Sequence, residues 1–230
     1  MITERIEFFM IYITGDTHGL HDSNKLNTIP ASERDYIIIT GDFGFLWKDE
    51  PDKREEDSLY WLHNLDPDIL FIDGNHENFN RLNNLPSQKM FKSDVGIVKD
   101  GIYHLKRGRV YQIEDKAIFT FGGALSIDKN IRQENISWWP EEIPSQQEFE
   151  TAIINLKKYD FKVDYIISHT APASITNIIV NNTKFDPTEG YLEEIKQRTE
   201  FKKWFFGHYH VDKKMGYYIS LYHEYVRINK

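Results

Sequence analysis

The sequence of 230 residues contains no cysteine, and this absence excludes two common ways of building a site. The chain can form neither disulfide bonds nor thiolate metal sites. Any metal ion must therefore be bound by histidine, asparagine, aspartate or glutamate side chains. Because a chain without cysteine suits oxidising and reducing compartments equally, this feature leaves the location open.

Long apolar segments are missing too. No run approaches the roughly 20 apolar residues that a membrane-spanning helix requires. The first nine residues include three charged side chains, and they lack the apolar core and the cleavage site of a secretory signal. We therefore expect a cytoplasmic protein that has no membrane partner.

An excess of basic residues is the third absence. The chain has 28 lysines and arginines against 36 aspartates and glutamates, which gives a formal net charge of −8. A broad grip on nucleic acid needs a basic face, so we expect no general nucleic-acid binding. A small phosphorylated substrate held by metal ions stays compatible with this charge. The length suits a single domain over residues 1–230.

Five segments share one pattern, in which an apolar run rich in β-branched residues ends at a polar turn. The runs are Met10–Thr14, Tyr36–Thr40, Ile69–Ile72, Val163–Ile167 and Trp204–Phe206. Continuous apolar runs are typical of strands that are buried on both faces. Layered α/β proteins place their sites just past the carboxyl ends of such strands. The pattern therefore predicts one polar site formed by five strand ends.

Helical patterns lie between and after these runs. We expect helices over Lys53–Asn64, Ser145–Tyr159, Pro172–Val180 and Thr188–Thr199. Ser145 and Glu148 form the signature of a capping box at the second of these. Strand signals over 97–122 suggest an antiparallel meander, and those over 215–228 suggest a closing hairpin-like pair. Together these elements predict an α/β fold, with mixed sheets and helices outside.

Residues 123–144 show no clean periodicity and include Asp128, Arg132, Trp138 and Trp139. Long segments without regular structure are often functional lids. Two readings stay open at this point. The segment is either a lid or insertion loop over the site, or a surface loop pinned by its two tryptophans.

Polar side chains that can bind metal gather at the five predicted strand ends. In chain order they are Asp16, His18, Asp42, Asn75, His76, His169, His208 and His210. Asp16 and His18 are two residues apart, so in an extended chain they project to the same side. The order Gly-Asp-x-His, Gly-Asp, Gly-Asn-His-Glu, a single His and Gly-His-x-His resembles the calcineurin-like metallophosphoesterase family. The resemblance spans residues 15–210 and includes five of the nine histidines.

The resemblance implies a sandwich of two mixed sheets flanked by helices, with two divalent metal ions at its edge. The first ion would be bound by Asp16, His18, Asp42 and His210, and the second by Asp42, Asn75, His169 and His208. We favour Mn²⁺, with Fe, Zn²⁺ or Ni²⁺ as alternatives, because these metals accept mixed nitrogen and oxygen ligands. A hydroxide bridging the metals would hydrolyse a phosphate ester. His76 stays off the metals and would protonate the leaving group.

One block departs from the phosphoprotein phosphatase branch of the family, which continues Gly-Asp-x-x-Asp-Arg-Gly. Here Phe45 and Leu46 occupy the places of the charged pair. The group that orients His76 is therefore unassigned, and the phosphate must be gripped from elsewhere. Arg132 and Arg81 are the candidates.

Aromatic residues follow the same block. Phe43 and Trp47 either line the cleft and stack on an aromatic leaving group, or pack the loop against the core.

We therefore expect a phosphoesterase that acts on a small phosphate ester, with a phosphodiester or nucleotide substrate favoured. A serine/threonine phosphoprotein phosphatase or another phosphomonoesterase is the alternative. A non-catalytic scaffold of the same fold is the rival from another class, and the complete set of ligands counts against it. The oligomeric state stays open.

Overall fold

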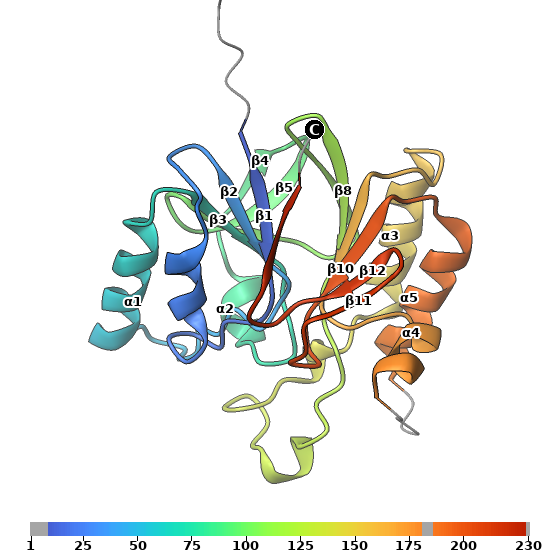
Figure 1. Ribbon diagram of the computed structural model, residues 1–230. Helices are drawn as coiled ribbons and strands as arrows, with labels where there is room; N and C mark the ends of the chain where they lie inside the picture. Colours follow the sequence, from blue (N-terminus) through green and yellow to red (C-terminus); the bar gives the residue numbers. More distant parts are fainter. Residues whose placement is uncertain (1–8, 181–185, 229–230) are drawn as a thin grey trace, which may run out of the picture.

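The computed structural model describes residues 9–180 and 186–228, and it consists of two mixed β-sheets packed face to face (Figure 1). The first sheet has seven strands, in the order β13 (Tyr225–Ile228), β1 (Ile11–Thr14), β2 (Tyr36–Ile39), β3 (Asp68–Phe71), β6 (Ile102–Leu105), β5 (Ser93–Lys99) and β4 (Ser87–Met90). Its central strands β1, β2, β3 and β6 run parallel, and the remaining strands are antiparallel to their neighbours.

The second sheet has six strands, in the order β11 (Lys213–Met215), β12 (Tyr218–Ser220), β10 (Lys203–Phe206), β9 (Tyr165–Ser168), β8 (Lys116–Phe121) and β7 (Arg109–Ile113). Strands β12, β10, β9 and β8 run parallel, whereas β11 and β7 pair antiparallel at the two edges. The predicted sandwich of two mixed sheets is thus confirmed.

Helices cover the outer face of each sheet (Figure 1). On the first sheet these are α1 (Lys53–His63) and α2 (Phe79–Asn83), and on the second α3 (Gln146–Lys157), α4 (Ala173–Ile179) and α5 (Pro187–Arg198). Short 3₁₀ helices cover η1 (Ser23–Thr28), η2 (Lys129–Ile131) and η3 (Pro140–Glu142). The predicted capping box at the start of α3 is present, because Ser145 and Glu148 each accept from the other's backbone N–H.

The central strands are buried on both faces, which explains their continuous apolar runs. In β2, Ile38 points into the core between the two sheets, while Ile37 and Ile39 point outward against the layer that contains Leu62 of α1. Such strands lie in the middle of the molecule with their carboxyl ends at one edge. This edge is at the bottom of Figure 1, next to the loop formed by residues 123–144.

Two predicted pairings are wrong. The strands over 102–121 do not form one meander, because β6 pairs with β3 and β5 in the first sheet while β7 and β8 pair in the second. Likewise β12 and β13 belong to different sheets, and the hairpin is formed by β11 and β12. Neighbouring strands are usually adjacent in one sheet, but here short connections cross from one layer to the other.

Candidate metal centre

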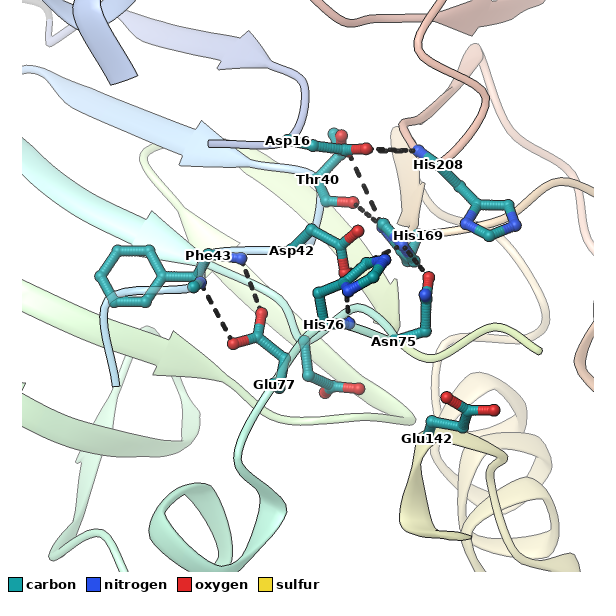
Figure 2. Close-up of polar contacts among 12 residues, drawn as sticks. Asp16, Thr40, Asp42, Phe43, Asn75, His76, Glu77, Glu142, His169 and His208 are labelled. Carbon is teal, nitrogen blue, oxygen red and sulfur yellow. Dashed lines mark hydrogen bonds and ion pairs between the residues drawn. The ribbon is translucent and has the colours of Figure 1, made fainter. Parts of the chain in front are cut away.

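The polar turns after β1, β2, β3, β9 and β10 meet at one edge of the sandwich (Figure 2). Each residue of one group, Asp16, His18, Asp42 and His210, offers a ligand atom within 4.8 Å of the others. This is the set predicted for the first metal.

The four residues predicted for the second metal also lie together. The Nε2 of His169 lies 3.3 Å from Oδ1 of Asp42 and 3.0 Å from Oδ1 of Asn75. The ring of His208 lies edge-on against that of His169, with the ring centroids 5.1 Å apart. The backbone N–H of His208 donates to Asp16, at 3.0 Å from Oδ2, which ties the last turn to the first (Figure 2).

The backbone at this edge has unusual dihedral angles. His18, Asp42, His208 and His210 all have positive φ, between 44° and 66°. Residues other than glycine rarely adopt this backbone conformation, which costs about 1–3 kcal/mol per residue. Such conformations cluster at functional sites, where the surrounding structure holds them in place.

Two glycines let the carboxylates approach the neighbouring turns. A Cβ on Gly74 would lie 2.0 Å from Oδ1 of Asp42, and a Cβ on Gly207 would lie 1.9 Å from Oδ1 of Asp16. Any side chain at either position would collide with a carboxylate oxygen. The glycines before Asn75 and His208 are therefore required by packing around the two aspartates.

Hydrogen bonds to the far ring nitrogens orient two of the histidines. The Nδ1 of His169 lies 2.9 Å from the carbonyl oxygen of Thr40, so its Nε2 faces Asp42. The Nδ1 of His18 lies 2.8 Å from Oδ2 of Asp22. Metal-binding histidines usually have such a partner on the other nitrogen. Asp22 is not among the predicted site residues, although it stands only four residues after His18 in the sequence.

A second pair of residues orients the amide of Asn75. Its Nδ2 donates to Oγ of Ser126 at 3.1 Å, and that hydroxyl donates to Glu142 at 2.5 Å. The amide oxygen is thereby left to face His169. Ser126 and Glu142 both belong to the 123–144 loop, so this loop helps to build the site.

Tyr209 connects the two loops that carry the histidines. Its hydroxyl lies 2.7 Å from Oγ1 of Thr170 and 2.6 Å from Oγ1 of Thr176, and it donates to Glu189 at 3.2 Å. Burial raises the pKa of Glu189 to about 7, and Asp186 adds to the rise. No sequence pattern indicated this network, because its members come from separate elements.

The electrostatics of the cluster favour added positive charge. Burial alone would raise the pKa of Asp42, but His169 and His18 outweigh it, so this pKa lies well below its usual range. Burial disfavours the charged form of the histidines, yet Asp42 and Asp16 raise the pKa of His18 to about 9 and of His169 to about 10.

The donor set fits divalent cations. Among the described residues, no lysine or arginine is paired with the carboxylate of Asp16 or Asp42. Burial, with His169 next in importance, lowers the pKa of His208 to about 4, so its imidazole is neutral and can donate an electron pair. The carboxylates of Asp42 and Asp16 favour the protonated forms of His18 and His169. A bound metal cation would balance the carboxylate charge in place of these protons.

His76 lies beside this cluster and contacts the 123–144 loop. Its backbone N–H donates to Oδ1 of Asp42 at 2.7 Å, and its ring Nε2 lies 3.5 Å from Nη2 of Arg132. Burial lowers the pKa of His76; Asp42 opposes this effect and Arg132 adds to it. Arg132 is held by Oδ2 of Asp128 at 2.7 Å and by the carbonyl of Ser137 at 3.1 Å.

The other candidate substrate contacts lie differently. Nη2 of Arg81 is bonded to Oε1 of Glu55 at 2.8 Å, and Arg81 also donates to the carbonyl of Lys48, so it ties α1 to the neighbouring loop. Phe43 is fully buried and stacks on Phe71 with centroids 3.9 Å apart. Of the two alternatives for Phe43, packing against the core is therefore the one that the structure has.

Trp47 is half-buried and lies edge-on to Trp139 of the 123–144 loop. It also lines a cavity of about 360 Å³ that His18 borders.

The side chain of Glu77 is buried, and it accepts hydrogen bonds from the backbone N–H groups of Phe43 at 2.6 Å and Gly44 at 3.3 Å. Burial, with Asp42, raises the pKa of Glu77 to about 8. Glu77 thereby fixes the turn that follows Asp42.

The structure thus combines a sandwich of two mixed sheets with an Asp/His cluster at its strand ends. The family model for calcineurin-like phosphoesterases matches residues 9–212, and the chain belongs to that family. Membership implies a hydrolase of phosphoric esters. A comparison with curated proteins finds no match. Among the described residues, no helix has the length and apolar character needed to cross a membrane.

Proposed function

We propose that the protein is a binuclear phosphoesterase in which Asp42 bridges two divalent metal ions. One observation carries the proposal: the two oxygens of this carboxylate face different ligand groups. Oδ2 lies 3.2 Å from Nε2 of His18, and Oδ1 lies 3.3 Å from Nε2 of His169. A carboxylate between two groups of nitrogen and oxygen donors is suited to two cations.

The first ion would be bound by Asp16, His18, Asp42 and His210, and the second by Asp42, Asn75, His169 and His208. When bound, two divalent ions would neutralise charge on the phosphoryl oxygens and acidify a water molecule. These ligand types suit Mn²⁺, which we favour, and also Fe, Zn²⁺ and Ni²⁺.

His76 supplies the proton for the leaving oxygen in this proposal. Its Nε2 lies 3.5 Å from the guanidinium of Arg132, which has only donors. An arriving phosphate would accept hydrogen bonds from Arg132, and His76 would then face the leaving group. In this proposal the 123–144 loop acts as a lid. It places Arg132 beside His76, and Ser126 and Glu142, near its two ends, orient the amide of Asn75.

We favour a phosphodiester or nucleotide over a phosphoprotein. Phe45 and Leu46 are buried, so the charged pair of the phosphoprotein phosphatase branch has no equivalent at these positions. A diester carries one negative charge fewer than a monoester dianion, and it needs fewer cations for its neutralisation. The cavity beside His18 and Trp47 offers room for a leaving group.

The test compares Mn²⁺-supported hydrolysis of an aryl phosphodiester with that of the matching monoester. The proposal predicts diester activity at least equal to monoester activity, and a strong monoester preference would favour the phosphatase alternative. His76→Ala should lower kcat about 10²–10⁴-fold, most for poor leaving groups, and leave the metal content intact. Loss of metal from this variant would contradict its role as a proton donor. His63→Ala is the matched control, since His63 bonds to the carbonyl of Asp100, away from the cluster.

A further inference from the structure

A second cavity, of about 700 Å³, is lined by Asp73, which precedes Asn75 by two residues. Its wall is formed by α2, the turn after β6, η3 and the first half of α3, and none of the proposed metal ligands lines it. This volume falls within the range of small-molecule sites. The cavity is therefore separate from the proposed reaction centre.

One lysine and two arginines line this cavity, and among the described residues only Arg107 of these three is paired with a carboxylate. Nε of Arg107 is buried and bonded to Oδ2 of Asp73 at 2.7 Å. Lys106 and Arg109 are half-buried, and neither is paired with a carboxylate in the part of the chain that the structure describes. Among the residues that the structure describes, the Nζ of Lys106 donates only to the hydroxyl of Ser87, at 3.0 Å. Two cationic groups are thus available to a ligand.

Three carboxylates line the cavity beside the three cations, but among the described residues none of them is bonded to Lys106 or Arg109. Glu148 accepts from the backbone N–H and the hydroxyl of Ser145, at 2.7 and 2.8 Å, and lies 3.4 Å from Arg107. Glu141 is the remaining carboxylate, and it is exposed and unpaired within the described residues. A ligand that fits carries an anionic group for the two cations and a hydroxyl or amine for Glu141.

We propose that this cavity is a second ligand site that binds a small organic phosphate independently of the metal ions. The phosphate would accept hydrogen bonds from Lys106 and Arg109, which form strong charge-assisted bonds to such oxygens. Its organic part would lie against Leu82 and Ile143, and Glu141 would accept from its hydroxyl groups. The proposal stands whether or not the metal centre is binuclear.

The site also adjoins the loop that builds the metal centre. Nη2 of Arg107 donates to the carbonyl oxygen of Glu142 at 3.3 Å, and the side chain of Glu142 holds Ser126 beside Asn75. A ligand in the cavity would therefore contact the support of the second metal's ligands.

The test is calorimetric titration of the full chain with AMP and with adenosine, before and after removal of metal by a chelator. We expect saturable binding of one AMP per chain that survives metal removal, and no binding of adenosine. Arg109→Gln and Lys106→Gln should each weaken AMP binding about tenfold, the effect of losing about 1.4 kcal/mol. The control Arg198→Gln removes an exposed arginine paired with Glu194 and should bind like the wild type.

Two results would overturn the proposal. One is AMP binding that disappears with the metal, since it would then belong to the metal centre. The other is equal affinity in the wild type, Arg109→Gln and Lys106→Gln, with all three chains shown to be folded by their thermal unfolding.

Discussion

Two buried aspartates follow neighbouring strands of the first sheet, and their surroundings differ in one respect. Asp42 follows β2 and Asp73 follows β3, with exposed fractions of 1% and 2%. Asp73 has a cation of its own in Arg107, 2.7 Å away. Asp42 is surrounded by imidazoles and backbone N–H groups.

From this difference we interpret Asp73 as a structural carboxylate and Asp42 as a proposed metal ligand. Burial opposes ionisation of Asp73, but Arg107 and His104 lower its pKa to about 2, so the charge is balanced within the protein. The imidazoles around Asp42 carry positive charge only when they are protonated. When the protein itself supplies no fixed cation, the charge of a buried carboxylate is best balanced by a cation bound from solution. At Asp42 we expect this cation to be a metal ion.

The largest effect is expected from Asp42→Asn. A neutral amide cannot balance two cations, so both the metal content and the activity should fall. We expect a loss of about a thousandfold in kcat, corresponding to about 4 kcal/mol of transition-state stabilisation. The measurement is diester hydrolysis with added Mn²⁺. Activity of Asp42→Asn within tenfold of the wild type would contradict the distinction between the two aspartates, because the reaction would then need the charge of Asp42 no more than that of Asp73.

Removing the cation from the other aspartate should affect folding rather than the reaction. Arg107→Gln leaves Asp73 buried without its cation, which typically costs about 3–5 kcal/mol in the free energy of unfolding. Denaturant unfolding measures this loss. Arg109→Gln is the matched control, because Arg109 has no ion pair in the described structure, and we expect it to change stability by less than about 0.5 kcal/mol.

The loss of stability in Arg107→Gln should depend on pH, because it arises from the ionised form of Asp73. In the wild type the folded pKa of Asp73, about 2, lies below its ordinary value, so its ionised form stabilises the fold above about pH 4. That contribution is lost as the pH falls toward 2. The difference in unfolding free energy between the wild type and Arg107→Gln should therefore narrow from pH 7 to pH 3. A difference that stays constant would show that Arg107 stabilises by packing alone.

A smaller effect is expected from Asp22→Ala, which leaves Asp42 in place and removes the partner of a ligand. Without Asp22, Nδ1 of His18 loses its hydrogen-bond partner at 2.8 Å. Such losses typically cost about 10–100-fold in metal affinity or activity. A Mn²⁺ titration of activity checks this expectation. His21→Ala is the control, since His21 contacts the other oxygen of Asp22 and is largely exposed. Equal Mn²⁺ dependence in the wild type and Asp22→Ala would contradict the role of Asp22.

Much of the fold could be predicted because its signals are local. Continuous apolar runs marked the buried strands, and the capping box marked the start of α3. The sheet to which β6 and β12 belong depends on partners far along the chain, and no periodicity encodes that choice. The two wrong pairings both arose there.

In the candidate site, too, the residues in local motifs could be predicted and those that depend on distant segments could not. The proposed ligands stand in short motifs at strand ends, so the sequence could indicate them. Their supports come from distant segments: Ser126 is 51 residues from Asn75, and Tyr209 is 39 residues from Thr170. Distance along the chain was also a poor guide to the arginines, because Arg132 is 56 residues from His76 and yet lies beside it.

Metal analysis of the purified wild type beside Asp42→Asn and Arg107→Gln tests the central claim most directly. The claim that Asp42 bridges two ions predicts about two divalent ions per chain in the wild type and in folded Arg107→Gln, and fewer than one in Asp42→Asn. Two ions retained by Asp42→Asn, or none in the wild type after Mn²⁺ is added, would contradict it.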